Sequence, residues 1–223
     1  MTESIDNRPT AAHLLAASMA ALCIDRIFTV AGESYLSLLD ALHDLPEIDL
    51  VTCRHEGSAG FMAVADAKLT GRTGVCLVSR GPGATNAAIA VHAANEDATP
   101  LIVLVGGVTT DEVDRESFQD FDAGRIFGGL AKAVWTVLEP QHLPEFLTRA
   151  VRLAESGTPG AVVLVMPENM LARRTDGVPA RRTQVDVVEP SQESLAKVRR
   201  KSWPESPTLH HAFGPIWRLC PAA

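Results

Sequence analysis

Short, unbroken apolar runs alternate with helical patterns along most of this chain, and the alternation limits the folds that are open to it. Six such runs predict buried strands at residues 27–31, 48–53, 74–79, 101–105, 133–138 and 161–166. The segments between them carry leucines and alanines at helical spacing. Uninterrupted apolar strands separated by helices are typical of a parallel sheet that is covered on both sides. We therefore predict an α/β fold with a doubly wound, mostly parallel six-stranded sheet and helices on both faces.

The ends of the predicted helices carry the residue types that helix ends prefer. Thr10 and Ser34 stand where N-caps are expected, and Gly71 stands where a left-handed C-cap is expected. Helices are predicted after both N-caps and at residues 56–69, 83–95 and 144–155. Residues 109–125 show no regular pattern and are expected to form an irregular polar loop.

The regular pattern ends near residue 172, and this change divides the chain. We expect a flexible N-terminus over residues 1–9, one domain over residues 10–172 and a polar linker over residues 173–197. Residues 198–223 hold two of the three tryptophans and four prolines without any periodicity. They predict an irregular C-terminal tail that is either disordered or foreign to the rest of the sequence, as after a shifted reading frame.

Composition and charge narrow the class of protein. A net charge of −7 leaves no basic excess to neutralise phosphates, so a nucleic-acid partner is not expected. The apolar runs are far shorter than the ~20 residues that span a bilayer, and the N-terminus lacks the parts of a signal peptide. We therefore expect a cytoplasmic protein with no membrane partner. The four cysteines form no CxxC pair and no zinc spacing, so no metal site is predicted.

The loops at the carboxyl ends of the strands form the candidate site, because doubly wound sheets bind their ligands there. Glu56 follows a strand and opens a helix. The helix N-terminus favours its charged form and burial favours its protonated form, and a carboxyl between these influences suits acid–base catalysis. Spacing alone equally allows Glu56 to complement the helix dipole, and it allows the neighbouring His55 to be a packed or capping residue.

A second candidate is the glycine-containing segment at residues 79–86, which also joins a strand to a helix. Gly81 and Gly83 would let the backbone approach a ligand closely. The segment is not a Walker A loop, and it lacks the third glycine of a GxGxxG motif. A purely structural turn would use the same glycines.

A third candidate lies in the irregular loop after the fourth strand. Phe118 and Gln119 place an aromatic ring beside a polar amide. That combination suits an active-site wall, and it suits a surface loop equally well.

Taken in order, these strings resemble the N-terminal, pyrimidine-binding domain of the thiamine-diphosphate-dependent acetolactate synthase and benzoylformate decarboxylase family. Arg54-His55-Glu56 is similar to the family's RHE segment, and residues 81–86 reproduce its GPGATN string. Further matches fall at Asp97, Pro100, Phe118, Gln119 and residues 156–162 and 166–168. The matches run in unbroken order from residue 9 to residue 171, which argues against an unrelated Rossmann-like binding module.

The resemblance implies a role for each matched position. Glu56 would be the catalytic residue, because its family counterpart hydrogen-bonds N1′ of the cofactor's aminopyrimidine ring. The bound cofactor serves as the electron sink for a 2-keto acid. The residues implied in cofactor binding are Gly32, Glu56, Gly81, Pro82, Gly83 and Asn86. Phe118 and Gln119 would face the substrate.

Three positions depart from the family pattern. Ala31-Gly32-Glu33 replaces the usual Pro-Gly-Gly and brings a carboxylate near the mouth of the pocket. Arg80 stands where a small residue is frequent, and Asp120 replaces a glutamate. These changes indicate a branch other than the true acetolactate synthases and leave the substrate open.

A further departure concerns the metal and the diphosphate. The family binds both through a GDG motif followed by Asn-Asn, and neither string occurs here; the nearest is Thr175-Asp176-Gly177. We therefore expect this chain to hold only the pyrimidine half of thiamine diphosphate, with Mg²⁺ bound by a domain outside this sequence. The resemblance implies a homodimer or a diphosphate-binding partner chain, and it does not decide whether FAD is bound.

Two functions follow from the resemblance. The first is the pyrimidine-binding half of a thiamine-diphosphate-dependent 2-keto acid decarboxylase or carboligase, a lyase or transferase that is inactive alone. The second is a truncated, catalytically inactive product that folds as the isolated domain. The aperiodic sequence after residue 198 favours the second.

Overall fold

The computed structural model describes residues 6–181 and 191–195 of the chain. The predicted tail at residues 198–223 lies outside these ranges, as do residues 182–190 and 196–197 of the predicted linker. Contacts divide the chain into two units, residues 1–185 and 186–223. Of the second unit, residues 192–195 form a helical turn. Every element discussed below belongs to the first unit.

Six parallel strands form one sheet in the order β2-β1-β3-β4-β6-β5. Their bounds are β1 (Arg26–Thr29), β2 (Asp49–Thr52), β3 (Gly74–Ser79), β4 (Leu101–Gly107), β5 (Ala133–Thr136) and β6 (Ala161–Pro167). All six predicted strands are present, with ends that move by at most two residues. The predicted doubly wound α/β fold is confirmed, and the sheet is parallel throughout these pairings.

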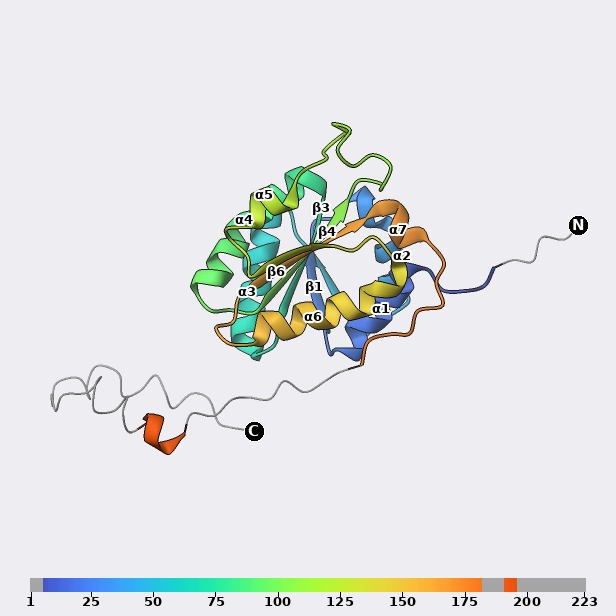
Figure 1. The fold of residues 1–223 in the computed structure, drawn as a ribbon. Helices are drawn as coiled ribbons and strands as arrows, with labels where there is room; N and C mark the ends of the chain where they lie inside the picture. The colour runs from blue at the N-terminus through green and yellow to red at the C-terminus, as the bar shows by residue number, and fades with distance from the viewer. Residues whose placement is uncertain (1–5, 182–190, 196–223) are drawn as a thin grey trace, which may run out of the picture. The chain divides into compact units, whose positions relative to one another are not determined.

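Helices cover both faces of the sheet (Figure 1). One face carries α1 (Ala11–Ala21), α2 (Leu36–His43), α6 (Leu143–Glu155) and α7 (Glu168–Ala172). The other carries α3 (Glu56–Thr70), α4 (Arg80–Glu96) and α5 (Ala123–Phe127). Two 3₁₀ turns, Glu33–Tyr35 and Pro140–His142, lead into α2 and α6. None of the helices in the described ranges is both long enough and apolar enough to cross a membrane.

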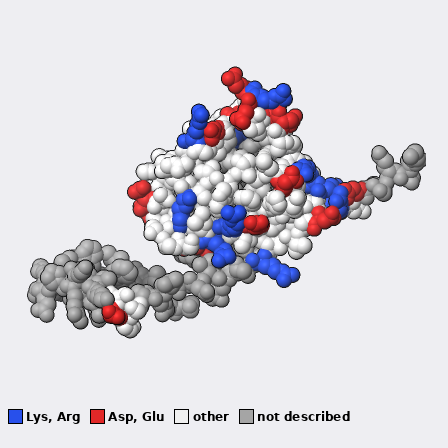
Figure 2. Space-filling model, viewed as in Figure 1, with Lys and Arg blue, Asp and Glu red and all other residues white. Residues whose placement is uncertain are grey.

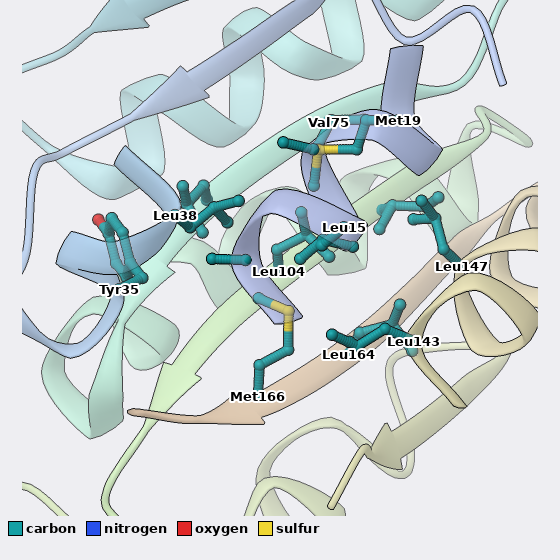
Figure 3. Packing of buried hydrophobic residues seen from close by; sticks show 14 of the residues in the cluster. Leu15, Met19, Tyr35, Leu38, Val75, Leu104, Leu143, Leu147, Leu164 and Met166 are labelled. Atoms are coloured by element: carbon teal, nitrogen blue, oxygen red, sulfur yellow. The ribbon is translucent and has the colours of Figure 1, made fainter. Parts of the chain in front are cut away.

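Alternate strand residues point into two separate cores. Leu104 packs with α1 and α6 on one side, whereas its neighbour Val105 packs with α3 and α4 on the other. Figure 3 shows the first core, where Leu15 of α1 and Leu147 of α6 converge on the strand side chains. Each fully buried aliphatic side chain of this kind contributes roughly 1.5–3 kcal/mol, and both faces of the strands contribute.

Two of the three predicted helix caps are confirmed. The Thr10 side chain accepts a hydrogen bond from the backbone N–H of His13, and Gly71 ends α3 with φ +69°. Ser34 is not a cap, so that prediction was wrong. Its hydroxyl instead donates to the carbonyl of Gly106 at 3.0 Å and lies 2.8 Å from the hydroxyl of Ser79. Because the hydroxyl is bonded to residues at the ends of β3 and β4, it does not accept a hydrogen bond from the first turn of a helix. Helix α2 begins two residues later, at Leu36.

The sequence did not indicate the helices α5 and α7. Each has five residues, which is too short for a helical period to show. Helix α4 also begins at Arg80, three residues before its predicted start, so the Gly-Pro-Gly string forms its first turn. Proline is tolerated there because the first N–H groups of a helix have no partner within the helix.

Residues 173–181, at the start of the predicted linker, lie alongside α1, from its first residues towards its last turn. Thr10 and Arg174 form an antiparallel bridge, and the N–H of Ala180 donates to the hydroxyl of Ser18 at 3.0 Å. The domain boundaries remain a prediction. These contacts tie the segment to the first unit beyond residue 172.

Candidate functional site

The carboxyl ends of the parallel strands meet at one edge of the sheet, and the predicted site residues lie in the loops and helix starts at that edge. Glu56 begins α3, after β2. Residues 81–86 form the first turns of α4, after β3. Gly32 lies between β1 and the turn that leads into α2. The structure therefore brings together segments that are separated by up to 54 residues in the sequence, from Gly32 to Asn86.

Glu56 and Asn86 form the central contact of the site. The Asn86 side-chain amide donates to Oε2 of Glu56 at 2.9 Å. The part of the chain that the structure describes provides no hydrogen-bond donor to Oε1. Glu56 itself is half-buried. One carboxylate oxygen is thus fixed in orientation while the other remains available to a ligand.

Small residues on α3 allow this contact to form. A Cβ on Gly60 would lie 2.4 Å from the Cβ of Ala90, and one on Gly57 would lie 3.3 Å from the carbonyl oxygen of Asn86. The two helices therefore approach more closely than larger side chains would permit. This approach carries Asn86 within reach of Glu56.

Gly83 faces the same carboxylate. A Cβ at this position would lie 3.4 Å from Oε1 of Glu56 and 3.5 Å from the Cβ of Val78. A methyl group would fit at these distances, whereas a longer side chain would cover Oε1. The glycine thus keeps open the carboxylate oxygen that has no hydrogen-bond partner among the described residues.

His55 caps α3, as one interpretation of the sequence held. Its Nδ1 accepts a hydrogen bond from the backbone N–H of Gly57 at 3.0 Å. Accepting this bond leaves Nε2 as the ring nitrogen that can donate to another group. The side chain fixes the start of the helix immediately before Glu56, which orients that carboxyl at the helix N-terminus.

Gly81 contacts the loop that follows β4. Its N–H donates to the carbonyl of Gln119 at 3.0 Å, and a Cβ there would lie 3.0 Å from the same oxygen. Gln119 has φ +64°, so its backbone bends to make this contact. Phe118 is 72% exposed. The predicted substrate-facing role of Phe118 and Gln119 stays a prediction.

Gly32 permits a second close approach. A Cβ on Gly32 would lie 2.4 Å from the Cβ of Ser79, at the end of β3. The chain after β1 therefore passes directly over the end of the neighbouring strand. The same loop buries Tyr35, whose hydroxyl donates to the carbonyl of Val30 and lies 3.2 Å from Oγ1 of Thr29. Burial raises the pKa of Tyr35 to about 12.

Arg80 joins two carboxylates across this edge. Its Nη1 lies 3.1 Å from Oε1 of Glu33, and its Nη2 donates to Oε2 of Glu168 at 2.9 Å. The sequence marked Glu33 and Arg80 as two separate departures from one family pattern. Their opposite charges were the available signal that they form a pair. Glu168 ends one of the matched strings, but nothing in the sequence indicated that it pairs with Arg80.

The loop between β4 and α5 is strongly acidic. Residues 109–122 hold six acidic side chains and one basic side chain, and Figure 2 shows charged groups gathered over this loop at the top of the view. Asp120, the third departure, accepts hydrogen bonds from the backbone N–H groups of Asp114 and Phe121 at 3.0 and 2.9 Å. Its carboxylate organises the loop itself.

The structure shows no cluster of three or more His, Cys, Asp or Glu side chains able to hold a metal ion within residues 6–181 and 191–195. Asp176, in the string that comes nearest to GDG, pairs with Arg8 at 2.9 Å. The following Gly177 lies against Leu14, where a Cβ would come within 2.4 Å of that side chain. This string serves to attach residues 173–181 to α1.

Comparisons with known proteins identify the family of this chain. The family model for the thiamine pyrophosphate enzyme N-terminal TPP binding domain matches residues 9–126. The Escherichia coli acetolactate synthase isozyme 3 large subunit is 38% identical over 160 residues, which cover 72% of this chain and 28% of that protein. The Corynebacterium glutamicum acetolactate synthase large subunit is 30% identical over 205 residues, which cover 92% and 31%.

The chain thus spans about a third or less of the length of these relatives. The matched region contains Gly32, Glu56 and the first turns of α4, where the helix-start carboxylate and its amide partner lie together. By its sequence match over residues 9–126 and its doubly wound parallel sheet, the chain belongs to the thiamine pyrophosphate enzyme family, as an N-terminal TPP binding domain.

Proposed function

We propose that this chain supplies the pyrimidine-binding half of a thiamine-diphosphate site in an enzyme that acts on 2-keto acids. The relatives named acetolactate synthase large subunits support an enzyme of this kind. The observation that carries the proposal is the Glu56 carboxylate, with Oε2 held by Asn86 and Oε1 left open. Gly32, Gly81, Pro82 and Gly83 shape the backbone around it.

The donor set fits the pyrimidine part of the cofactor. An aminopyrimidine ring nitrogen requires a carboxyl group that can hold or share a proton at one oxygen, and Oε1 of Glu56 meets that need. Asn86 keeps the other oxygen from turning away. Gly83 leaves room beside Oε1 for a flat ring. The bound cofactor would supply the electron sink for cleaving the carbon–carbon bond beside the keto group.

The other half of the site would come from a separate domain that binds the diphosphate and Mg²⁺. Glu56 is half-buried, whereas proton sharing with a ring nitrogen is strongest where water is excluded. Helices α3 and α4 expose large apolar residues in the turns that follow Glu56 and Asn86: Phe61 at 44%, Met62 at 42% and Ile89 at 56%. Such a surface suits burial against another domain, contributed by a second copy of the chain or by a partner chain.

Reconstitution tests the proposal. The purified chain is mixed with thiamine diphosphate, Mg²⁺ and pyruvate, with and without a candidate subunit that carries a diphosphate-binding domain. We expect decarboxylation that depends on the second subunit and is abolished by Glu56→Gln. Glu145→Gln on the far helix layer is the matched control, because it makes the same change at an exposed residue paired with Arg149. That variant should retain activity.

Two other outcomes would count against the proposal. Activity that survives Glu56→Gln would remove the carboxylate from the mechanism. No activity with any diphosphate-binding subunit, together with no cofactor binding by the chain, would support the catalytically inactive folded domain instead.

A further inference from the structure

Arg80 occupies an unusual position at the start of α4. It has φ +42°, a backbone conformation that is costly for a residue with a side chain. Its side chain is only 12% exposed. Its Nε is buried and has no hydrogen-bond partner among the described residues. A strained backbone and a buried guanidinium together need a compensating interaction.

The two ion pairs provide that interaction, and they span the sheet edge. Glu33 follows β1, Arg80 follows β3 and Glu168 follows β6. In the sheet order β1-β3-β4-β6, the guanidinium therefore reaches past the end of β4 to connect loops from three strands. Ion pairs between fully exposed side chains contribute little, but the guanidinium here is mostly removed from water.

The first two turns of α4 connect Arg80, which the two ion pairs hold in place, to the residues of the candidate site. Gly81, next to Arg80, donates its N–H to Gln119 at 3.0 Å. Gly83, one residue after the proline, faces Glu56, and Asn86 donates to the same carboxylate at 2.9 Å. A shift of the helix start would move all of these contacts together, because they lie on one rigid segment.

We propose that Arg80, held by Glu33 and Glu168, is a positioning residue that fixes the first turns of α4 and thereby maintains the hydrogen bond from Asn86 to Glu56. Its importance for catalysis rests on the proposed function, whereas the positioning itself does not require the cofactor. The proposal also explains why two departures from the family pattern occur in one chain. Glu33 and Arg80 are the two ends of a single ion pair.

Nuclear magnetic resonance of the full ¹⁵N-labelled chain tests the positioning without cofactor. The side-chain amide of Asn86 reports the hydrogen bond, and Glu56→Ala defines its signals when that bond is absent. We expect Arg80→Met to move the Asn86 amide signals most of the way to that reference. Hydrogen exchange at the Gly81 amide should become at least about tenfold faster. Arg80→Lys, which keeps the charge, should restore part of both effects.

Arg26→Met is the matched control. Arg26 also pairs with two carboxylates, Asp49 at 3.3 Å and Asp66 at 2.6 Å, but at the opposite edge of the sheet. It should lose two ion pairs and leave the Asn86 and Gly81 signals unchanged. If Arg80→Met does not fold, the double variant Glu33→Gln/Glu168→Gln makes the same test with the arginine retained.

Unchanged Asn86 signals in a folded Arg80→Met chain would overturn the inference, as would equal changes in Arg26→Met. Cofactor titration separates this result from a failure of the proposed function. A chain that binds no thiamine diphosphate even in the presence of a diphosphate-binding subunit refutes the proposed function and leaves the resonance experiment intact. A chain that binds it should require at least about tenfold more cofactor for half-saturation in Arg80→Met than in Arg26→Met.

Discussion

Gly60 and Ala90 bring α3 and α4 into direct contact, because a Cβ on Gly60 would stand 2.4 Å from the Cβ of Ala90. Gly60→Ala should therefore destabilise the chain despite the better helix propensity of alanine. Overpacking costs about 1–3 kcal/mol, and the gain in propensity is at most about 1 kcal/mol. We expect a net loss of about 1 kcal/mol in the free energy of unfolding, measured by urea denaturation.

Two further variants test this explanation. Gly129→Ala should change stability by less than about 0.5 kcal/mol, since the described residues beyond its chain neighbours place no atom within 4 Å of the added Cβ. Gly60→Ala/Ala90→Gly should restore the Asn86 amide signals that Gly60→Ala disturbs. A Gly60→Ala chain as stable as the parent would show that the helices separate without cost.

Gly83 is predicted to keep Oε1 of Glu56 accessible to the cofactor. Gly83→Leu should leave the chain folded and raise the thiamine diphosphate needed for half-saturation by at least about tenfold, because the longer side chain covers that oxygen. Gly83→Ala should have a much smaller effect, since its methyl group would lie at ordinary contact distance, 3.4 Å, from Oε1. Calorimetric titration in the presence of the diphosphate-binding subunit measures both. Equal affinities in the two variants would contradict the predicted role.

Tyr35 offers a direct measurement of burial, because it is the single tyrosine in the sequence. Burial raises its pKa from 10.0 to about 12. The phenolate absorbance of the folded chain should therefore appear near pH 12, and that of the urea-unfolded chain near pH 10.0. Ionisation of the folded chain near pH 10.0 would contradict the buried position.

The same shift predicts how stability depends on pH. The folded pKa exceeds the unfolded value, so this contribution is fully present below pH 10.0 and is lost as the pH rises through about 12. Cys76 acts in the same direction, since burial raises its pKa from 9.0 to about 12. Tyr35→Phe should accordingly show a smaller loss of unfolding free energy above pH 10.0, and the remaining slope should come from Cys76 and other groups.

Lys132 closes the carboxyl end of α6. Its ammonium donates to the carbonyls of Leu153, Ser156 and Thr158 at 2.6, 2.7 and 2.8 Å. Lys132→Met should cost about 2–3 kcal/mol of unfolding free energy, because three carbonyls lose a charged donor. Lys68→Met, which breaks an exposed pair with Asp97, should cost less than about 1 kcal/mol. Similar losses in both variants would show that the three contacts stabilise no more than a surface pair.

Much of the fold could be predicted because its signals are local. The six strands are apolar on both faces, and Thr10 and Gly71 cap their helices through contacts within a few residues. Ser34 failed as a cap because its hydroxyl bonds to Ser79 and Gly106, which are distant in the sequence. The preference of serine for N-cap positions is a local signal, and it does not predict hydrogen bonds to residues so far away in the sequence.

The sequence named candidate site residues, and their functional roles stay predictions, but it did not indicate the contacts between them. Glu56 and Asn86 were both proposed as site residues, whereas their hydrogen bond depends on how closely two helices approach. The link from Arg80 to Glu33 and Glu168 depends on the strand order. Such contacts emerge only when the whole sheet has been assembled.

The position of β6 has a consequence for folding during synthesis. This strand pairs with β4 on one side and β5 on the other, although it leaves the ribosome after both. Because chains emerge N-terminal first, β5 has no strand to pair with until residues 161–167 appear. Glu168 follows at once and completes the two ion pairs of Arg80. A ribosome that pauses before this point would therefore present an unpaired strand edge, and we expect chaperone binding to the nascent chain to concentrate there.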